Sequence, residues 1–162
     1  HPDDFHYFGD YNILPSVQTT HATSDMYWAE KRVGKERMKG AYAFKDLLEQ
    51  NGWLPNGSDF PVERINPLFG FYAAVARKDQ SGYPADGFQK ENSLSREQAL
   101  RAMTIWAARA GKEEHLKGSI ETGKLADLTI TTTDLMTAPE EELFKIKVLS
   151  TYSGGELVFS GE

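Results

Sequence analysis

The fold is decided by the stretch Trp53-Leu54-Pro55-Asn56-Gly57-Ser58-Asp59-Phe60-Pro61-Val62-Glu63, in which a short apolar run leads directly into glycine, serine and two carboxylates. Residues 53–56 predict a brief β-strand, and residues 13–18 predict another strand upstream. Between the two, over residues 24–50, apolar side chains recur at spacings of three and four, which is typical of helix, in two runs that Gly34 interrupts. Strand, helix and strand in this order form the repeating unit of a parallel sheet, so the sequence predicts an α/β fold.

Two further helices are expected downstream of this unit. Residues 66–77 carry an apolar stripe with Pro67 at the first helical position, where proline is tolerated. Residues 95–110 continue a buried face behind the capping box Ser95-Arg96-Glu97-Gln98. The segment between them, residues 79–94, is rich in Gly, Pro, Ser and Asp and predicts a long loop of the kind that is often functional.

The chain changes character near residue 118. Beyond this point apolar residues lie among Gly, Thr and Asp, and Ser153-Gly154-Gly155-Glu156 predicts a hairpin turn between two strands. We therefore expect helix–strand units over residues 1–117 and a β segment over residues 118–162.

Composition excludes several classes of protein. The 162 residues carry a net charge of −6 without a block of Lys or Arg, so no nucleic-acid partner is expected. The longest uncharged run, residues 65–76, is too short to span a membrane, which needs about 20 apolar residues. The absence of Cys excludes disulfides and thiolate zinc sites. No secretory signal is visible and a cytoplasmic location is favoured, although the chain begins with His rather than Met.

The strongest candidate for chemistry is Asp59. A carboxylate at the carboxyl end of a parallel strand lies where α/β folds place ligands and catalytic groups. The alternative interpretation is that Asp59 only caps the helix that follows.

His21 is the second candidate, because it follows the other predicted strand. An imidazole there could bind a metal ion, a substrate or a proton in transfer, whereas the alternative is a loop histidine that hydrogen-bonds to the backbone. Ser24 and Asp25 are expected to cap the next helix. No second histidine lies beside His21, so the chain offers at most one or two ligands where zinc usually takes three.

Four strings together carry a resemblance to a known family. These are Ser16-Val17-Gln18-Thr19-Thr20-His21-Ala22-Thr23-Ser24-Asp25-Met26, Gly40-Ala41-Tyr42, Gly57-Ser58-Asp59-Phe60-Pro61-Val62-Glu63 and Gly118-Ser119-Ile120-Glu121-Thr122-Gly123-Lys124-Leu125-Ala126-Asp127-Leu128. In this order they resemble the third amidohydrolase family, which includes proteins similar to N-substituted formamide deformylase and relatives called exoenzyme regulatory proteins. The resemblance covers nearly the whole chain.

The resemblance implies a (β/α)8 barrel, the TIM-barrel fold, with a small β-sandwich and one or two divalent ions, usually zinc. Asp59 matches the aspartate that ligates the ion at the eighth strand, and His21 matches a position after the seventh strand. The family's paired histidines on the first strand, its bridging lysine and its other histidine ligands have no counterpart here. A full barrel takes about 250 residues, so we expect residues 1–117 to hold only its last helix–strand units and residues 118–162 part of the sandwich.

The function that follows is metal-dependent hydrolysis of carbon–nitrogen bonds in small amides, formamides or cyclic amides. Asp59 would ligate the metal and act as the catalytic base, while Gln18, His21 and Glu63 would position the substrate. We expect the chain alone to be inactive and to associate with copies of itself, because part of a barrel leaves strand edges unpaired. The alternative is a non-catalytic regulatory or scaffold protein that retains the amidohydrolase fold.

Overall fold

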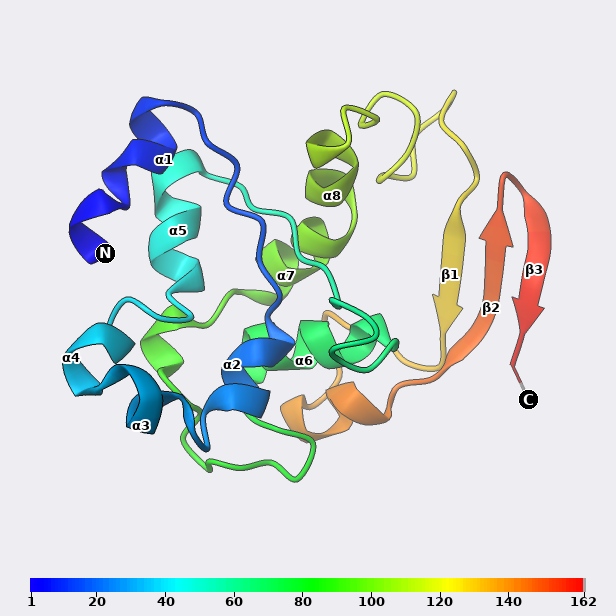
Figure 1. Cartoon of the computed structure of the whole chain (residues 1–162). Helices are drawn as coiled ribbons and strands as arrows, with labels where there is room; N and C mark the ends of the chain where they lie inside the picture. The colour runs from blue at the N-terminus through cyan, green and yellow to red at the C-terminus, as the bar shows by residue number, and fades with distance from the viewer. Residues whose placement is uncertain (162) are drawn as a thin grey trace.

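The computed structural model describes residues 1–161 and contains mostly short helices beside one small sheet (Figure 1). The helical elements are η1 (Pro2–Asp4), α1 (His6–Asp10), α2 (Thr20–Asp25), α3 (Ala29–Val33), α4 (Lys35–Met38), α5 (Phe44–Asn51), α6 (Pro67–Ala76), η2 (Lys90–Asn92), α7 (Arg96–Met103), α8 (Ile105–Ala110) and η3 (Glu140–Lys145). The strands are β1 (Leu128–Thr131), β2 (Val148–Ser153) and β3 (Glu156–Ser160).

The two segments that were expected to form parallel strands lie side by side and run parallel, as predicted. They are joined at one bridge, Val17 to Asn56, where Val17 donates its N–H to the carbonyl of Pro55 at 3.0 Å and accepts the N–H of Gly57 at 3.0 Å. Each segment contains a proline, Pro15 or Pro55, which has no N–H to donate to a ladder. The expected strands are therefore reduced to this one bridge, and no closed barrel is formed within residues 1–161.

The helical stretch expected over residues 24–50 is wrong in its start, whereas the predicted interruption at Gly34 is confirmed. The first helix, α2, already begins at Thr20, and the stretch is then divided into α3, α4 and α5. Gly34, at φ +82°, ends α3 in a conformation that residues with a Cβ rarely adopt. The second break, between α4 and α5, was not predicted; there Tyr42 adopts a left-handed conformation with φ +56°, which does not continue a helix.

The downstream helices agree with the sequence pattern. The side chain of Asn66 accepts the N–H of Leu68 at 3.0 Å and opens α6 in front of Pro67. Ser95 and Gln98 form the predicted capping box at the start of α7. The helix expected to run on to residue 110 is divided at Thr104, whose hydroxyl bonds back to the carbonyl of Leu100 at 2.7 Å and whose backbone leaves the helical region.

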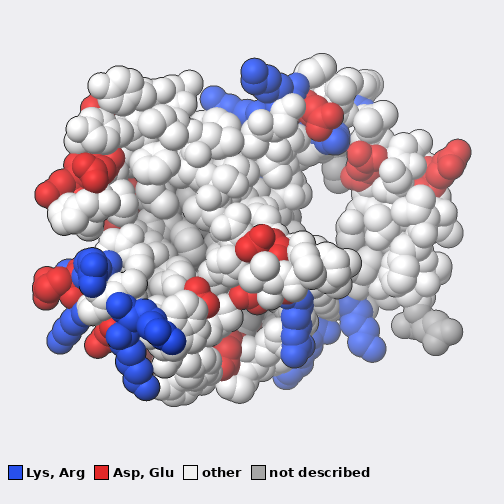
Figure 2. All heavy atoms as spheres, viewed as in Figure 1, with Lys and Arg blue, Asp and Glu red and all other residues white. Residues whose placement is uncertain are grey.

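The three strands form an antiparallel sheet in the order β1-β2-β3. The predicted hairpin joins β2 to β3, with Ser153 opposite Glu156 and both turn glycines, Gly154 and Gly155, at positive φ, as a tight hairpin turn requires. The sheet stands beside the helical part, and Figure 2 shows an opening between them on the face in view. On that face acidic and basic side chains are interspersed along the lower edge.

The hydrophobic core is centred on α6, whose Phe71 is fully buried between other helices. The buried core residues are Val17, Ala22, Phe44, Leu48, Leu54, Leu68, Phe71, Tyr72, Ala74, Ala76, Leu94, Ala99, Ala102, Ala138, Leu143 and Ile146. The last three come from η3 and its flanks, so the C-terminal part also contributes to this core. A division at residues 117 and 118 stays a prediction.

The segment expected to be a long loop, residues 79–94, contains only the short η2. Its far end is attached to α6, because Phe88 donates its N–H to the carbonyl of Arg77 at 2.7 Å and Leu94 donates to Ala74 at 2.9 Å.

Among the described residues, no helix has both the length and the apolar character that a membrane crossing requires.

Candidate functional site

His21 and Asp59 meet at one edge of the two parallel segments. Nε2 of His21 lies 3.3 Å from Oδ2 of Asp59, although the residues are far apart in sequence. The Asp59 side chain is 45% exposed, so its carboxylate is open to small molecules, whereas Nε2 of the 27% exposed His21 side chain is buried. The expectation that both residues face the same edge is confirmed.

Local backbone geometry places the two side chains. His21 lies in the first turn of α2 and donates its N–H to the carbonyl of Gln18 at 3.2 Å. Asp59 adopts a left-handed conformation with φ +57°, and its carbonyl accepts the N–H groups of Val62 at 2.8 Å and Glu63 at 3.4 Å. Aspartate tolerates this conformation better than most residues do. The resulting turn directs the Asp59 carboxylate towards α2.

The two alternative roles considered for these residues are not observed. Asn66, not Asp59, caps α6. Within the described residues, buried Nε2 of His21 has no hydrogen-bond partner, and its contact with Asp59 lies within ion-pair distance without the angles of a hydrogen bond. The imidazole is therefore available to interact with the carboxylate electrostatically when it is protonated.

Ser24 and Glu63 form a second link between the same two segments, since the Ser24 hydroxyl donates to Oε1 of Glu63. The expected capping role of Ser24 and Asp25 is wrong, because α2 begins earlier and both residues lie at its end. Asp25 instead accepts a hydrogen bond from the Tyr42 hydroxyl at 2.8 Å. Burial, and then this bond, raise the pKa of Tyr42 well above its usual value.

Gln18 lies at the point where the first parallel segment leads into α2. It is half-buried, and its carbonyl receives the N–H of His21. The proposed substrate contacts of Gln18, His21 and Glu63 stay predictions, as does the catalytic role of Asp59.

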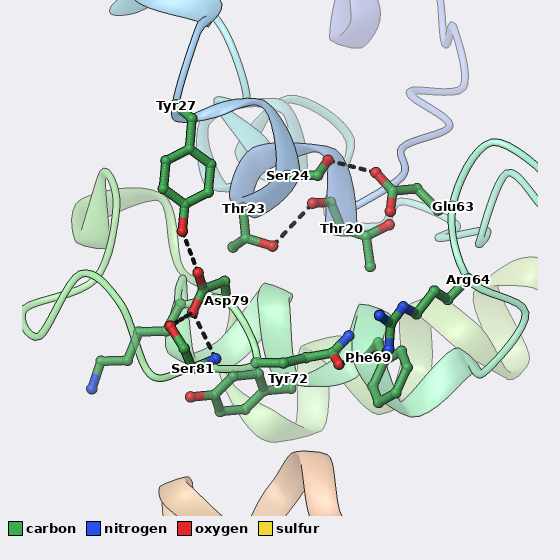
Figure 3. Close-up of a pocket in the computed structure, with 12 residues that line it drawn as sticks. Thr20, Thr23, Ser24, Tyr27, Glu63, Arg64, Phe69, Tyr72, Asp79 and Ser81 are labelled. Carbon is green, nitrogen blue, oxygen red and sulfur yellow. Dashed lines mark hydrogen bonds between the residues drawn. The ribbon is translucent and has the colours of Figure 1, made fainter.

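A pocket of about 320 Å³ lies beside α2 (Figure 3). Its walls come from α2, from the start of α6 and from residues 78–81. The residues that line it are Thr20, Thr23, Ser24, Tyr27, Glu63, Arg64, Phe69, Tyr72, Lys78, Asp79, Gln80 and Ser81. Of these, Glu63 was predicted to contact substrate, Ser24 was predicted to cap a helix, and residues 79–81 belong to the loop that was expected to be functional. The spacing of Thr20, Thr23 and Ser24 on α2 is the signal that could have indicated the remaining wall.

Asp79 organises the left wall of this pocket in Figure 3. It accepts hydrogen bonds from the hydroxyls of Tyr27 and Ser81 and from the backbone N–H groups of Ser81 and Tyr83. Burial alone would raise the pKa of Asp79, but these hydrogen bonds outweigh burial and lower the pKa below its ordinary value. Asp79 is therefore a fixed anion whose acceptor capacity is taken up by the protein.

The described residues do not fit a complete metal centre. Within residues 1–161 no three or more His, Cys, Asp or Glu side chains come together in a way that could hold a metal ion. Asp59 offers one carboxylate and His21 one ring nitrogen, whereas catalytic zinc takes three protein ligands. A full ligand set would need residues beyond those described.

Comparison with known proteins agrees with this fold and these motifs. A sequence model described as the amidohydrolase family matches residues 3–159. Protein LONG AFTER FAR-RED 3 of Arabidopsis thaliana is 37% identical over 163 residues, which cover 98% of this chain and 27% of that protein. N-substituted formamide deformylase of Arthrobacter pascens is 30% identical over 116 residues, which cover 72% of this chain and 21% of that protein.

Among solved structures, the crystal structure of an uncharacterized metal-dependent hydrolase from Pyrococcus horikoshii OT3 resembles this chain with a TM-score of 0.75 and 30% identity. That similarity covers 86% of this chain and 28% of the other. The chain thus spans about a quarter of the length of the relatives it matches. The match of the family model to nearly all residues confirms the resemblance seen in the sequence motifs, and the chain belongs to the amidohydrolase family.

Proposed function

We propose that this chain contributes the Asp59–His21 pair to a hydrolase that cleaves carbon–nitrogen bonds in small amide-type molecules, including formamides and cyclic amides. The observation that carries the proposal is the 3.3 Å contact between His21 Nε2 and Asp59 Oδ2 at the ends of two adjacent parallel segments. An exposed carboxylate beside an imidazole is a combination suited to proton transfer. Membership in the amidohydrolase family supports hydrolysis as the reaction class.

In the proposed reaction, the Asp59 carboxylate takes a proton from a water molecule as the water oxygen adds to the amide carbonyl carbon. The proton then passes to the amide nitrogen while the carbon–nitrogen bond breaks, which releases an amine and a carboxylic acid. His21, in contact with the carboxylate, orients it and compensates its charge when the imidazole is protonated.

Substrate positioning is proposed for Gln18, His21 and Glu63. All three lie near the junction of the parallel segments with α2 or in the turn that begins at Asp59. Glu63 accepts a hydrogen bond from Ser24, which holds its carboxylate beside α2.

We also propose that Asp59 is one ligand of a divalent ion, zinc being the candidate, in the complete hydrolase. The described residues supply too few ligands for such an ion, so the others would come from outside them. The Pyrococcus horikoshii relative, a metal-dependent hydrolase by description, supports this part of the proposal.

The test is a chimera in which this chain replaces the matching segment of N-substituted formamide deformylase, to which it is 30% identical. We expect the chimera to hydrolyse an N-substituted formamide, and Asp59→Asn to lower kcat about 100-fold or more because the carboxylate base is lost. Glu97→Gln is the matched control, since Glu97 is an exposed carboxylate paired with Arg101 on α7.

Equal activity of Asp59→Asn and Glu97→Gln chimeras would refute the role of Asp59. A folded chimera without any hydrolysis, with zinc content also unaffected by Asp59→Asn, would favour the alternative of a regulatory or scaffold protein that retains the amidohydrolase fold. The 162-residue chain alone serves as the reference, and we expect it to bind zinc weakly and to hydrolyse nothing.

A further inference from the structure

Helices α3 and α4 carry an excess of positive charge, in contrast to the acidic remainder of the chain. Residues 30–39 contain five Lys or Arg residues and two Glu residues, a net charge of +3 in a chain whose net charge is −6. This segment has no run of more than two basic residues, but Gly34, at φ +82°, turns the chain so that the two short helices are in contact. Figure 2 shows Lys and Arg side chains gathered over α3 and α4 at the lower left.

Most cations of this group are without a counterion. Lys31, Arg32 and Lys35 are exposed, and among the described residues no carboxylate lies within ion-pair distance of them. Lys39 forms an exposed ion pair with Glu36 at 2.6 Å. We call Lys31, Arg32, Lys35 and Lys39 the basic face. Neighbouring cations repel one another, so a partner that carries carboxylates would relieve this repulsion.

Exposed aromatic side chains border the basic face. Trp28 immediately precedes α3 and is 49% exposed, and it stands three and four residues before Lys31 and Arg32, within one helical turn. Tyr27 is 54% exposed, and its ring stacks on that of Tyr83 with the centroids 6.0 Å apart. Trp, Tyr and Arg are enriched among the residues that contribute most to protein–protein binding. The face and its border therefore have the composition of a protein-binding surface.

The backbone beneath the basic face is held by the rest of the protein. Ala29 on α3 is 3% exposed and Met38 on α4 is 6% exposed, so each helix is anchored by a buried side chain. The carbonyl of Met38 also accepts a hydrogen bond from Nε2 of Gln89 at 2.6 Å, which attaches α4 to the segment before η2. A partner would therefore have to order only the side chains of the face, which keeps the entropic cost of binding low.

The basic face is short and is bordered by acidic residues. Because α3 has five residues and α4 has four, each helix is no longer than about 8 Å. Gly40, next to α4, lies against Pro2, so Asp3 and Asp4 are close to this end of the face, and Asp46 lies in the first turn of α5. A long polyanion would meet these carboxylates and the net negative charge of the chain. A short acidic segment would meet the cations alone.

We propose that the basic face and Trp28 form a docking surface for a short acidic peptide segment of a partner protein. Two or three carboxylates of that segment would accept hydrogen bonds from the cations of the face, and an apolar side chain between them would lie on the Trp28 ring. None of these residues lines the pocket beside α2 or belongs to the Asp59–His21 pair, and the proposal requires no catalysis.

The probe is the pentapeptide acetyl-Glu-Glu-Phe-Glu-Glu-amide, added to the full 162-residue chain at low ionic strength. Its controls are the analogues in which glutamine replaces every glutamate or alanine replaces phenylalanine. Binding is followed by the chemical shifts of the backbone amides and of the Trp28 indole N–H.

We expect the acidic peptide to bind at least about tenfold more tightly than the glutamine analogue and about threefold more tightly than the alanine analogue. The largest shifts should lie over residues 28–39. Since exposed charges are screened by salt, NaCl at about 0.5 M should remove most of the difference between the acidic peptide and the glutamine analogue.

Variants test which side chains bind the peptide. Lys31→Gln combined with Arg32→Gln should weaken binding about fivefold. Arg101→Gln combined with Lys147→Gln removes the same number of positive charges elsewhere on the surface and should weaken binding less than about twofold. Glu36→Gln removes a carboxylate from α4 and should strengthen binding about twofold, a gain that loss of folding cannot produce. Circular dichroism verifies that all variants are folded.

The proposal is overturned if the acidic peptide and its glutamine analogue bind equally, or if the shifts map outside residues 28–39. It is also overturned if the folded Lys31→Gln, Arg32→Gln protein binds the peptide as the control variant does, or if Glu36→Gln weakens binding.

Two further outcomes would replace the acidic peptide with another occupant and so overturn the proposal. The first is tighter binding at this face of an eight-nucleotide DNA oligonucleotide, or of vesicles of phosphatidylserine and phosphatidylcholine in equal parts, than of the peptide. The second is shifts over residues 28–39 that depend on protein concentration without any peptide, which would indicate a second copy of the chain. Since no turnover is measured, these outcomes are independent of whether the Asp59–His21 pair is catalytic.

Discussion

Asn56 makes two hydrogen bonds to Thr19 across the parallel segments: its Oδ1 accepts the backbone N–H of Thr19 at 3.0 Å and its Nδ2 donates to the Thr19 hydroxyl at 3.0 Å. The same hydroxyl donates to the carbonyl of Gly70 in α6 at 2.7 Å. Because Pro15 and Pro55 cannot donate to a ladder, these side-chain bonds do part of what a longer pair of strands would do. They hold the start of α2, and with it His21, near the turn that carries Asp59.

Replacing Asn56 with alanine should therefore destabilise the chain by about 1–3 kcal/mol, because the buried N–H of Thr19 loses its partner and the Thr19 hydroxyl keeps only its bond to Gly70. Urea unfolding followed by circular dichroism measures this difference. Asn51→Ala is the control, since it removes an exposed bond to Ile13, and should cost no more than about 0.5 kcal/mol. Equal losses in the two variants would contradict the importance of the Asn56 bridge.

Gly70 should respond to substitution in a way that depends on Asn56. A Cβ at Gly70 would lie 3.2 Å from Asn56 Nδ2 and 3.5 Å from Thr19 Oγ1. Within a helix alanine is favoured over glycine by about 1 kcal/mol, but here the crowding should break the Asn56 bridge, so Gly70→Ala is expected to destabilise. In the Asn56→Ala background the crowding is gone and Gly70→Ala should stabilise. The same sign in both backgrounds, measured by urea unfolding, would show that the crowding is absent.

Arg77 should be replaceable by methionine at less cost than by alanine. It is fully buried over the ring of Phe44 at 5.1 Å, and burial lowers the pKa of its guanidinium to about 10. It donates to the carbonyl of Phe88 at 2.8 Å and to Gln89 at 3.0 Å. Arg77→Ala leaves a cavity and should cost about 2–4 kcal/mol, whereas Arg77→Met fills the space without a buried charge.

Both Arg77 variants lose the same hydrogen bonds and share the same left-handed backbone at φ +58°. Their difference in thermal unfolding therefore reports packing against Phe44 and Phe88. If methionine were as destabilising as alanine, the hydrogen bonds rather than the packing of Arg77 would dominate.

Asp79 should make the chain sensitive to acid. Burial alone would raise the pKa of Asp79, but hydrogen bonds from Ser81, Tyr27 and Tyr83 lower this pKa below its ordinary value of 3.8. A carboxyl group with a lower pKa in the folded state stabilises that state above its unfolded pKa, and the contribution is lost as the pH falls through the folded value. Thermal unfolding between neutral pH and pH values below 3.8 should show a smaller acid loss for Asp79→Asn than for the unmodified chain.

Tyr27→Phe provides the intermediate case, because it removes one of the donors to Asp79 and leaves the others. Its acid loss should fall between those of the other two proteins. Three identical acid profiles would exclude a contribution of Asp79 to stability.

Strand β3 is the surface on which we expect self-association. It lies at an edge of the sheet, and all five of its residues are exposed, including Leu157, Val158 and Phe159. Edge strands with apolar side chains pair readily with other chains, and a lysine on the edge opposes this. Val158→Lys should reduce association in light scattering at high protein concentration, whereas Thr133→Lys, in an exposed turn, should not. Association unaffected by Val158→Lys would place the contact elsewhere.

The parts that could be predicted from sequence are those that depend on neighbouring residues. Asn66 with Pro67, the capping box at Ser95, and the glycine pair of the hairpin specify their elements through bonds within a few residues, and each is observed as expected. The family motifs around His21 and Asp59 likewise indicated the site, because a carboxylate and an imidazole after adjacent strands were expected at one edge.

The tertiary structure decided the features that depend on contacts between distant segments. The segments around Val17 and Asn56 do not form long strands, because Pro15 and Pro55 lack the backbone N–H that a strand ladder needs. Ser24 is a hydrogen-bond partner of Glu63 instead of a helix cap. The pocket beside α2 exists only because separate segments are linked by bonds such as that of Tyr27 to Asp79. Local backbone preferences are encoded by residues that are near one another in the sequence. Contacts between distant side chains depend instead on how the whole chain packs, so motif and helix signals alone could not reveal the pocket.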